Sequence, residues 1–244
     1  MLARKSLRTI VIIPTYNERE NIVRLCKKVL SQGNSLDVLV VDDDSPDGTG
    51  EAVQKETENN ARINLLSRSG KQGLGTAHIA GYLWGFKRGY DRIVTMDADF
   101  SHPPERIPAM IKLSRSCEVV IGSRYIEGGG YEDWPLHRIF LSAASNWVAR
   151  TFLRLTPRDC TGAFRCFQTG ALREIPLENI RATGYDFQEE MLWQCSGRGW
   201  DIGEVPITFA QREAGSSKIN LGEIVRAAWT VLRLVFTPDG ERRK

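Results

Sequence analysis

The chain has no long apolar run, no paired cysteines and little net charge. None of its 244 residues belongs to a stretch of the ~20 apolar residues that a membrane-spanning helix needs, so we expect no such helix. Five scattered cysteines without a CxxC pair argue against a zinc or redox site and predict reduced thiols in a cytoplasmic setting. A net charge of +3 is too slight to indicate nucleic acid. The first apolar run ends at Pro14, too early for a signal peptide.

Short apolar runs alternate with amphipathic stretches in the first half of the chain, which is typical of βαβ units on a mostly parallel sheet. Strands are predicted at 9–13, 36–41, 63–66, 92–96 and 119–121, and helices at 20–30, 50–58, 76–88, 105–115 and 136–155. There is no linker and no internal repeat. Residues 1–244 are therefore expected to form one α/β domain with an open, mostly parallel sheet.

Carboxylate-rich clusters follow three of the predicted strands, at 14–18, 42–47 and 97–101. In open α/β sheets, ligands bind outside the carboxyl ends of the strands, so we expect these clusters to form the functional site. The most informative is Met96-Asp97-Ala98-Asp99. Two carboxylates separated by one small residue can both reach a hard divalent cation where the chain turns away from the sheet. Such a cation would neutralise the charge on a departing diphosphate, although an isolated pair of this kind can also be a solvated acidic turn.

The other two clusters suit a nucleotide. An acidic residue after the second strand, Asp43, can accept hydrogen bonds from ribose hydroxyls or a base edge. Asp47 or Thr49 can cap the following helix, which would leave Asp43 available to a ligand. In the first cluster, Tyr16 could border a base and Asn17 and Glu18 could contact the nucleotide, or the segment could be a plain turn.

The glycine-containing loop and the basic residues are less specific. The segment 71–77 matches neither the Walker pattern nor GxGxxG, so it is interpreted as a close turn into a helix. Arginine and lysine side chains suit phosphate oxygens, and the candidates in the second half of the chain are Arg124, Arg138, Arg212 and Lys218.

Residues 219–236 are predicted to form an amphipathic helix. Its apolar face comprises Leu221, Ile224, Val225, Ala228, Trp229, Leu232, Val235 and Phe236, and Glu223, Arg226, Thr230 and Arg233 fall opposite. Two interpretations remain open, a terminal helix that packs on its own core and a helix that lies in a membrane interface.

Taken together, these motifs resemble the inverting nucleotide-sugar transferases of the GT-A fold, and more narrowly the dolichyl-phosphate (polyprenyl-phosphate) mannose synthases. The similarity runs through 14–21, 41–49, 73–77, 96–105, 122–125 and 212–218, six ordered motifs over nearly the whole chain. It implies mannose transfer from GDP-mannose to a lipid phosphate, with inversion, by an enzyme that works from the cytoplasmic side of a membrane. It also implies peripheral membrane contact, with or without a membrane partner subunit.

The resemblance also implies roles for individual residues. Nucleotide-sugar contacts fall on Pro14, Tyr16, Asn17, Glu18, Val41, Asp43, Asp97, Ala98, Asp99, Arg124, Arg212 and Lys218. Asp97 and Asp99 would hold Mg²⁺ or Mn²⁺. The catalytic set would be Asp99, Arg124, Arg212 and Lys218, and Arg138 and Ser142 are acceptor-phosphate candidates. Some relatives have a glutamine metal ligand where this chain has Ser101, so the resemblance does not extend to that position.

Three alternatives stay open. A close one changes the specificity to glucose, to UDP or to a glycan acceptor. A sugar-nucleotide nucleotidyltransferase would need a basic, glycine-rich turn after the first strand, where this chain has an acidic one. A non-enzymatic membrane-surface module would leave the strand-end carboxylates without a role.

Overall fold

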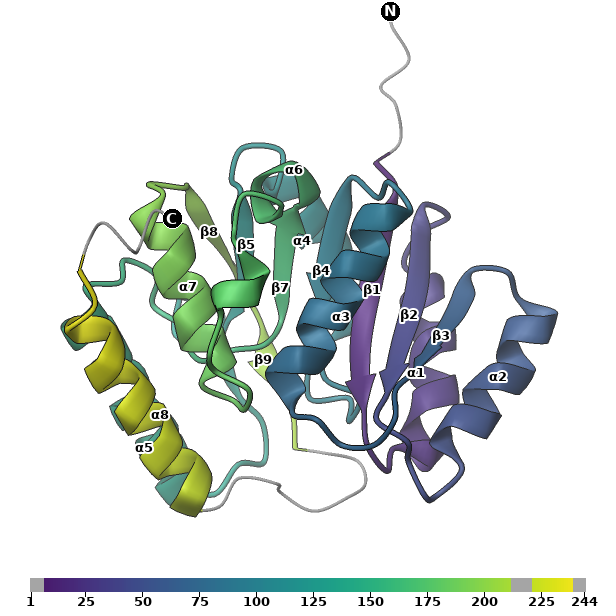
Figure 1. Cartoon of the computed structure of the whole chain (residues 1–244), viewed down its shortest axis with the longest axis horizontal. Coiled ribbons are helices and arrows are strands. Elements are labelled where there is room, and N and C mark those ends of the chain that lie inside the picture. The colour runs from purple at the N-terminus through teal and green to yellow at the C-terminus, as the bar shows by residue number, and fades with distance from the viewer. Residues whose placement is uncertain (1–6, 212–220, 239–244) are drawn as a thin grey trace, which may run out of the picture.

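The structure is a computed structural model that describes residues 7–211 and 221–238 (Figure 1). The first half builds a parallel sheet from β1 (Thr9–Thr15), β2 (Leu36–Asp42), β3 (Ile63–Ser67) and β4 (Arg92–Thr95), connected by α1 (Arg19–Leu30), α2 (Thr49–Asn59) and α3 (Leu74–Lys87). These elements confirm the predicted ones to within two residues at each end.

The second half extends this sheet and adds further helices and a separate two-stranded sheet. Its elements are the 3₁₀ turn η1 (Pro104–Arg106), α4 (Ile107–Leu113), β5 (Val119–Ser123), β6 (Gly130–Tyr131), α5 (Leu136–Leu153), β7 (Arg165–Gln168), α6 (Thr169–Leu172), the 3₁₀ turn η2 (Leu177–Asn179), α7 (Phe187–Gly197), β8 (Ile202–Pro206), β9 (Thr208–Phe209) and α8 (Leu221–Val235). Within the described residues, the main sheet has the order β3-β2-β1-β4-β7-β5-β8, and β6 pairs with β9.

Two details differ from the expectation. The helix predicted at 105–115 is divided into η1 and α4, because Pro108 has no N–H with which to continue a helical ladder from Pro104. Apart from α5, the elements from β6 to β9 were not predicted individually, and β7 changes the character of the sheet. β7 runs antiparallel between β4 and β5, so the sheet is mostly but not wholly parallel.

The central strand β1 is buried on both faces. Ile10 and Ile12 belong to the core layer that includes α3 and α7, whereas Val11 and Ile13 belong to the opposite layer under α1 and α4. This explains why β1 is a continuous apolar run rather than an alternating one. Gly81 lets α3 lie close to the sheet, because a Cβ there would stand 2.6 Å from Cγ2 of Ile12.

The described part of the chain has no helix with both the length and the apolar content required to cross a bilayer. α5 and α8 lie side by side at one end of the molecule, away from β1 to β3 (Figure 1).

Candidate functional site

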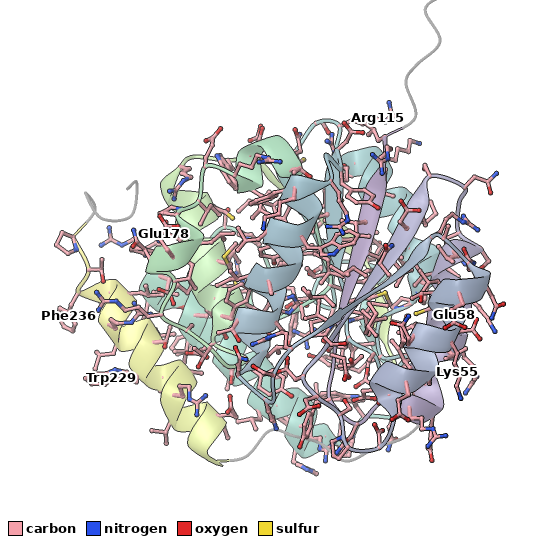
Figure 2. All side chains as sticks on the ribbon, turned by 45° about the vertical axis from the view of Figure 1, so that its right-hand side comes forward. Lys55, Glu58, Arg115, Glu178, Trp229 and Phe236 are labelled. Atoms are coloured by element: carbon pink, nitrogen blue, oxygen red, sulfur yellow. The ribbon has the colours of Figure 1, made fainter. Side chains whose placement is uncertain are left out.

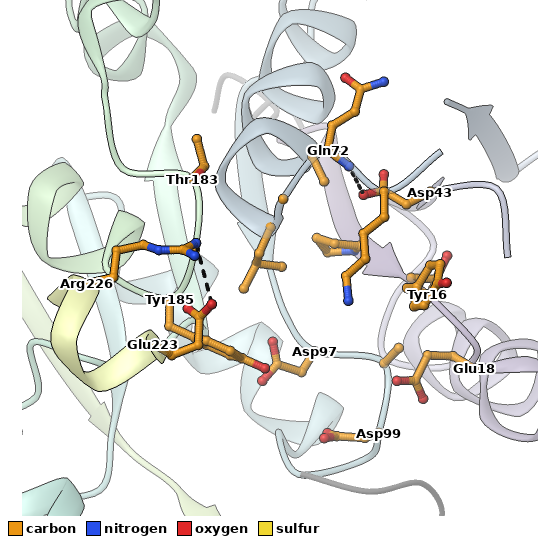
Figure 3. A pocket seen from close by; sticks show the side chains of 18 residues that line it. Tyr16, Glu18, Asp43, Gln72, Asp97, Asp99, Thr183, Tyr185, Glu223 and Arg226 are labelled. Atoms are coloured by element: carbon orange, nitrogen blue, oxygen red, sulfur yellow. Dashed lines mark hydrogen bonds and ion pairs between the residues drawn. The ribbon is translucent and has the colours of Figure 1, made fainter. Parts of the chain in front are cut away.

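A cavity of about 440 Å³ lies at the carboxyl ends of β1, β2 and β4 (Figure 3). One wall comes from β1 and the loop after β2, the centre from the turn after β4, and the opposite wall from the segment 183–185 and α8. The lining residues are Pro14, Thr15, Tyr16, Glu18, Asp43, Lys71, Gln72, Gly73, Leu74, Ala77, Asp97, Ala98, Asp99, Thr183, Gly184, Tyr185, Glu223 and Arg226. The structure thus brings residues of all three predicted clusters together.

Asp97 and Asp99 occupy the centre of this cavity, and the turn after β4 fixes both. Phe100 adopts a positive φ of 64°, which reverses the chain directly after Asp99. The N–H and hydroxyl of Ser101 donate to Oδ1 of Asp99 at 3.1 and 2.6 Å. Ser101 therefore orients a carboxylate at the position where some relatives have a metal ligand.

Sequence reasoning missed the role of His102. Its Nδ1 accepts a hydrogen bond of 3.0 Å from the backbone N–H of Asp97, and its ring stacks on Phe164. His102 is buried, and this burial lowers the pKa of its imidazole, which keeps the ring neutral and able to accept. His102 thus anchors the backbone that carries the first carboxylate.

The two central carboxylates suit a hard divalent cation, because both present oxygen ligands to the same cavity. No group of three or more His, Cys, Asp or Glu side chains among the described residues could complete a metal site. A ligand's own oxygens would therefore have to fill the remaining positions. The charge of the cavity lining also favours a bound cation, because five carboxylates line the cavity and only two cationic side chains, Lys71 and Arg226, are among the described lining residues. An anionic ligand needs a positive ion to enter it.

Asp43 lies at one end of the cavity, and Arg68 holds it there. Nη1 of Arg68 is 3.0 Å from Oδ1 of Asp43, and the N–H of Gln72 donates to Oδ2 at 3.2 Å. Burial raises the pKa of Asp43, and the Arg68 charge opposes that rise. Asp43 therefore lines the cavity with its carboxylate oriented by Arg68 and Gln72, and its expected contact with a nucleotide stays a prediction.

The neighbouring acidic residues are structural, as the capping alternative proposed. Oδ1 of Asp47 accepts hydrogen bonds from the N–H and hydroxyl of Thr49 at the start of α2, and Oδ2 accepts from the N–H of Arg19. Asp42 accepts from the hydroxyls of Thr15 and Ser45 at 2.8 and 2.6 Å. These bonds fix the loop from which Asp43 projects.

The other nucleotide-contact candidates divide into two groups. Pro14, Tyr16 and Glu18 line the cavity, and Nζ of Lys71 lies 4.6 Å from the centroid of the Tyr16 ring. Two candidates do not line it. Asn17 is exposed, with a positive φ of 59°, and the Val41 side chain is fully buried in the core because β2 points it away from the cavity.

The structure does not bring Arg124 to the cavity. Its Nε and Nη2 each donate to one oxygen of Asp159 at 2.7 Å, and Nη2 also donates to Thr161. The Arg124 and Asp159 side chains are at most 8% exposed, and this bidentate pair engages the Nε–Nη2 edge of the guanidinium. A carboxylate 35 residues further along the chain thus holds this arginine outside the cavity lining, and its expected contact with a diphosphate stays a prediction.

The acceptor-phosphate candidates also lie outside the cavity lining. Arg138 is exposed on the first turn of α5. The Ser142 hydroxyl forms a closed triangle with the hydroxyls of Tyr125 and Tyr131, with O···O distances between 2.7 and 2.9 Å. Arg212 and Lys218 lie outside the described residues.

If α8 packed on the core as a terminal helix, its apolar face would meet the protein, but the structure shows the opposite orientation. Its polar side faces the protein: Thr230 donates to Asp186 at 2.7 Å, and Arg233 pairs with Glu190 at 2.8 Å. The predicted apolar face points outward, with Trp229 65% and Phe236 78% exposed (Figure 2). Val231 and Leu234 alone supply buried apolar contacts among the large side chains described on this helix.

Comparison with known proteins places the chain among close relatives. Residues 10–181 match the family model described as glycosyl transferase family 2. The chain is 41% identical to an undecaprenyl-phosphate mannosyltransferase of Micrococcus luteus, over 93% of each protein. It is 40% identical to a polyprenol monophosphomannose synthase of Mycolicibacterium smegmatis, over 93% of this chain and 87% of that protein.

Solved structures share the fold at lower identity. A glucosyl-3-phosphoglycerate synthase of Mycobacterium tuberculosis, in complex with Mn²⁺ and UDP, superposes with a TM-score of 0.69 at 16% identity, over 96% of this chain and 81% of that one. A mannosyltransferase of Pyrobaculum calidifontis, in complex with GDP-Man and Mn²⁺, gives a TM-score of 0.62 at 18% identity, over 95% and 64%. The fold is therefore GT-A, and the chain belongs to glycosyl transferase family 2.

Proposed function

We propose that this protein transfers mannose from GDP-mannose to a polyprenyl or dolichyl phosphate, with inversion, and so makes polyprenyl phosphate mannose for glycan or lipoglycan synthesis. The observation that carries the proposal is the position of Asp97 and Asp99 at the end of β4, in one cavity with Asp43. The names of the two relatives that are 40 and 41% identical support the choice of mannose and of a lipid phosphate.

In this proposal the donor lies along the cavity. Its nucleoside occupies the end formed by Pro14, Tyr16 and Asp43, where the Asp43 carboxylate accepts hydrogen bonds. Its diphosphate lies at Asp97 and Asp99, which hold Mg²⁺ or Mn²⁺ through their side chains, with the Ala98 backbone alongside. A divalent cation bound there supplies Lewis-acid stabilisation of the charge on the leaving GDP.

The protein's own contribution is mainly positioning. Ser101 orients the Asp99 carboxylate and His102 anchors the Asp97 backbone before the donor arrives, which reduces the reorganisation needed during the reaction. A lipid phosphate is already an anion at neutral pH and needs little help from a general base. Transfer then depends on aligning that oxygen with the anomeric carbon, on the face opposite the leaving diphosphate, which inverts the configuration.

The acceptor is embedded in a membrane, and the outward apolar faces of α5 and α8 suit peripheral contact with a lipid surface. These neighbouring helices expose a set of large apolar side chains: Leu136, Phe140, Leu141, Trp147 and Phe152 from α5, and Ile224, Val225, Trp229, Leu232, Val235 and Phe236 from the α8 end. Contiguous apolar surface of this kind marks an interaction site. The free state of all five cysteines supports the cytoplasmic face, and residues 1–244 would act there as one catalytic domain.

The direct test incubates the protein with radiolabelled GDP-mannose, Mn²⁺ and polyprenyl phosphate in vesicles, followed by organic extraction. Label in the organic phase is expected from the wild-type protein and is expected to be nearly lost in Asp99→Ala. The matched control is Glu58→Ala, which removes an exposed carboxylate on α2 outside the cavity. Near-normal transfer by Asp99→Ala would contradict the metal assignment.

A second experiment on the same protein distinguishes the alternative donor specificities. Differential scanning fluorimetry with GDP, UDP and their mannose and glucose conjugates, with and without Mn²⁺, is expected to show stabilisation by GDP-mannose that depends on the metal. Preferential stabilisation by UDP-glucose would replace the donor while it keeps the reaction class.

A further inference from the structure

The cavity has a second end, which no predicted motif identified. Thr183, Gly184 and Tyr185 form it together with Glu223 and Arg226 of α8, and it lies across Asp97 from the end that contains Asp43 (Figure 3). If the nucleoside lies at Asp43 and the diphosphate at Asp97 and Asp99, the group attached beyond the diphosphate must lie here. In a nucleotide sugar that group is the hexose.

The charges at this end favour a neutral polyol over an anion. Glu223 and Arg226 pair at 3.5 Å, with side chains 19% and 50% exposed, so the carboxylate offsets the positive charge of the guanidinium. An anion would approach Arg226 only in the presence of Glu223 and of the Asp97 carboxylate. Sugar hydroxyls, in contrast, both donate and accept, and they match a carboxylate beside a guanidinium.

The local backbone is built to let the carboxylate approach. A Cβ at Gly184 would lie 2.6 Å from Oε2 of Glu223 and 3.2 Å from Nη1 of Arg226. The segment itself is held from behind: Asp186 accepts from the N–H of Gly184 at 3.0 Å, and Gly75 donates to the carbonyl of Thr183 at 2.9 Å. The wall is therefore anchored to both α3 and α7.

We propose that the inward polar face of α8 is the sugar-binding wall of the donor site. Glu223 accepts hydrogen bonds from hydroxyls of the hexosyl group, and Arg226 donates to a hydroxyl oxygen. The proposal rests on the function proposed above for the same cavity. It gives α8 two roles, because the opposite face of the same helix is the exposed apolar one.

The test separates sugar recognition from nucleotide recognition. Calorimetry with Mn²⁺ compares GDP and GDP-mannose on the full chain and on Glu223→Gln and Arg226→Gln. Each variant is expected to weaken GDP-mannose binding about 10-fold and to leave GDP binding within about twofold, because GDP lacks the hexose. Glu178→Gln, an exposed change of the same kind outside the cavity, is the matched control and should alter neither affinity.

Gly184→Ala provides an independent perturbation, since the added Cβ displaces the Glu223 carboxylate, and it should reproduce the selective loss. Thermal unfolding of each variant checks the fold. Equal loss of GDP and GDP-mannose affinity, or no loss of either, would overturn the sugar wall. A change confined to the KM for polyprenyl phosphate would also overturn it, since that result assigns the pair to the acceptor. Should the wild-type protein prefer UDP-glucose, the proposed donor is wrong and the same comparison of UDP with UDP-glucose still tests the wall.

Discussion

Arg68→Gln tests whether the nucleoside end of the cavity depends on a buried ion pair. Arg68 and Asp43 have side chains that are only 8% and 7% exposed, and Nη2 of Arg68 also donates to Gln72 and Thr76 at 3.0 and 2.7 Å. Removing one partner of a buried pair costs ~3–5 kcal/mol, because the remaining charge has lost its compensation. In a domain of this size that loss corresponds to a fall in Tm on the order of 10 °C.

Nucleotide binding should change in a pH-dependent way. Burial already raises the pKa of Asp43 and Arg68 opposes the rise, so in Arg68→Gln the pKa goes up further. The ionised carboxylate that accepts nucleoside hydrogen bonds is then lost progressively as the pH falls. Calorimetry with GDP and Mn²⁺ should show an affinity that falls as the pH is lowered, and the fall should begin at a higher pH in Arg68→Gln than in the wild-type protein.

A double-mutant cycle with Asp43→Asn supplies the control. Arg68→Gln combined with Asp43→Asn leaves no buried unpaired carboxylate, so it should be more stable than Arg68→Gln alone, with a coupling energy of about 0.5–3 kcal/mol. Additive stability changes, together with an unaltered pH profile of GDP binding in Arg68→Gln, would refute the reasoning.

Two further predictions concern stability. Burial raises the pKa of Glu189 to about 7 from its usual 4.5, so the folded state keeps a proton that the unfolded chain releases. That stabilisation is complete below about pH 4.5 and is lost as the pH rises through about 7. Urea unfolding should therefore show a free energy of unfolding that declines by ~3 kcal/mol over this range, and the decline should be absent in Glu189→Gln. Gly81→Ala places its Cβ 2.6 Å from Ile12 and should cost ~1–3 kcal/mol, measured by Tm. The control Gly170→Ala, which meets nothing within 4 Å, should not lower Tm.

Local patterns were sufficient to predict the first half of the fold. Continuous apolar runs such as 10–13 can only be strands buried on both faces, and a parallel sheet places their carboxyl ends at one edge. Asp43, Asp97 and Asp99 therefore meet in one cavity although they are up to 56 positions apart in the chain. The prediction needed the topology of the sheet and no side-chain detail.

Residues whose role depends on a distant partner could not be predicted in this way. The sequence around Arg124 is consistent with a phosphate grip, but only the fold shows that Asp159 occupies its Nε–Nη2 donor edge. The periodicity of α8 identified its two faces correctly. It could not show which face meets the protein, because the hydrogen bonds to Asp186 and Glu190 come from α7 and its N-terminal flank.

The inverted packing of α8 follows from the charge balance of the α7 region. Asp186 and Glu190 are both buried at 2% exposure, and a buried carboxylate is tolerated only where hydrogen-bond donors or cations reach it. Backbone N–H groups of residues 181, 182 and 184 supply some of these donors, and Thr230 and Arg233 supply the others from α8, which favours a polar side turned inward. Its apolar residues then have no protein to cover them on the described surface, so the cost of exposing Trp229 and Val225 is recovered only when a lipid surface or another apolar partner covers that face. The inward orientation of the polar side of α8 thus both places Glu223 at the cavity and leaves the apolar face exposed.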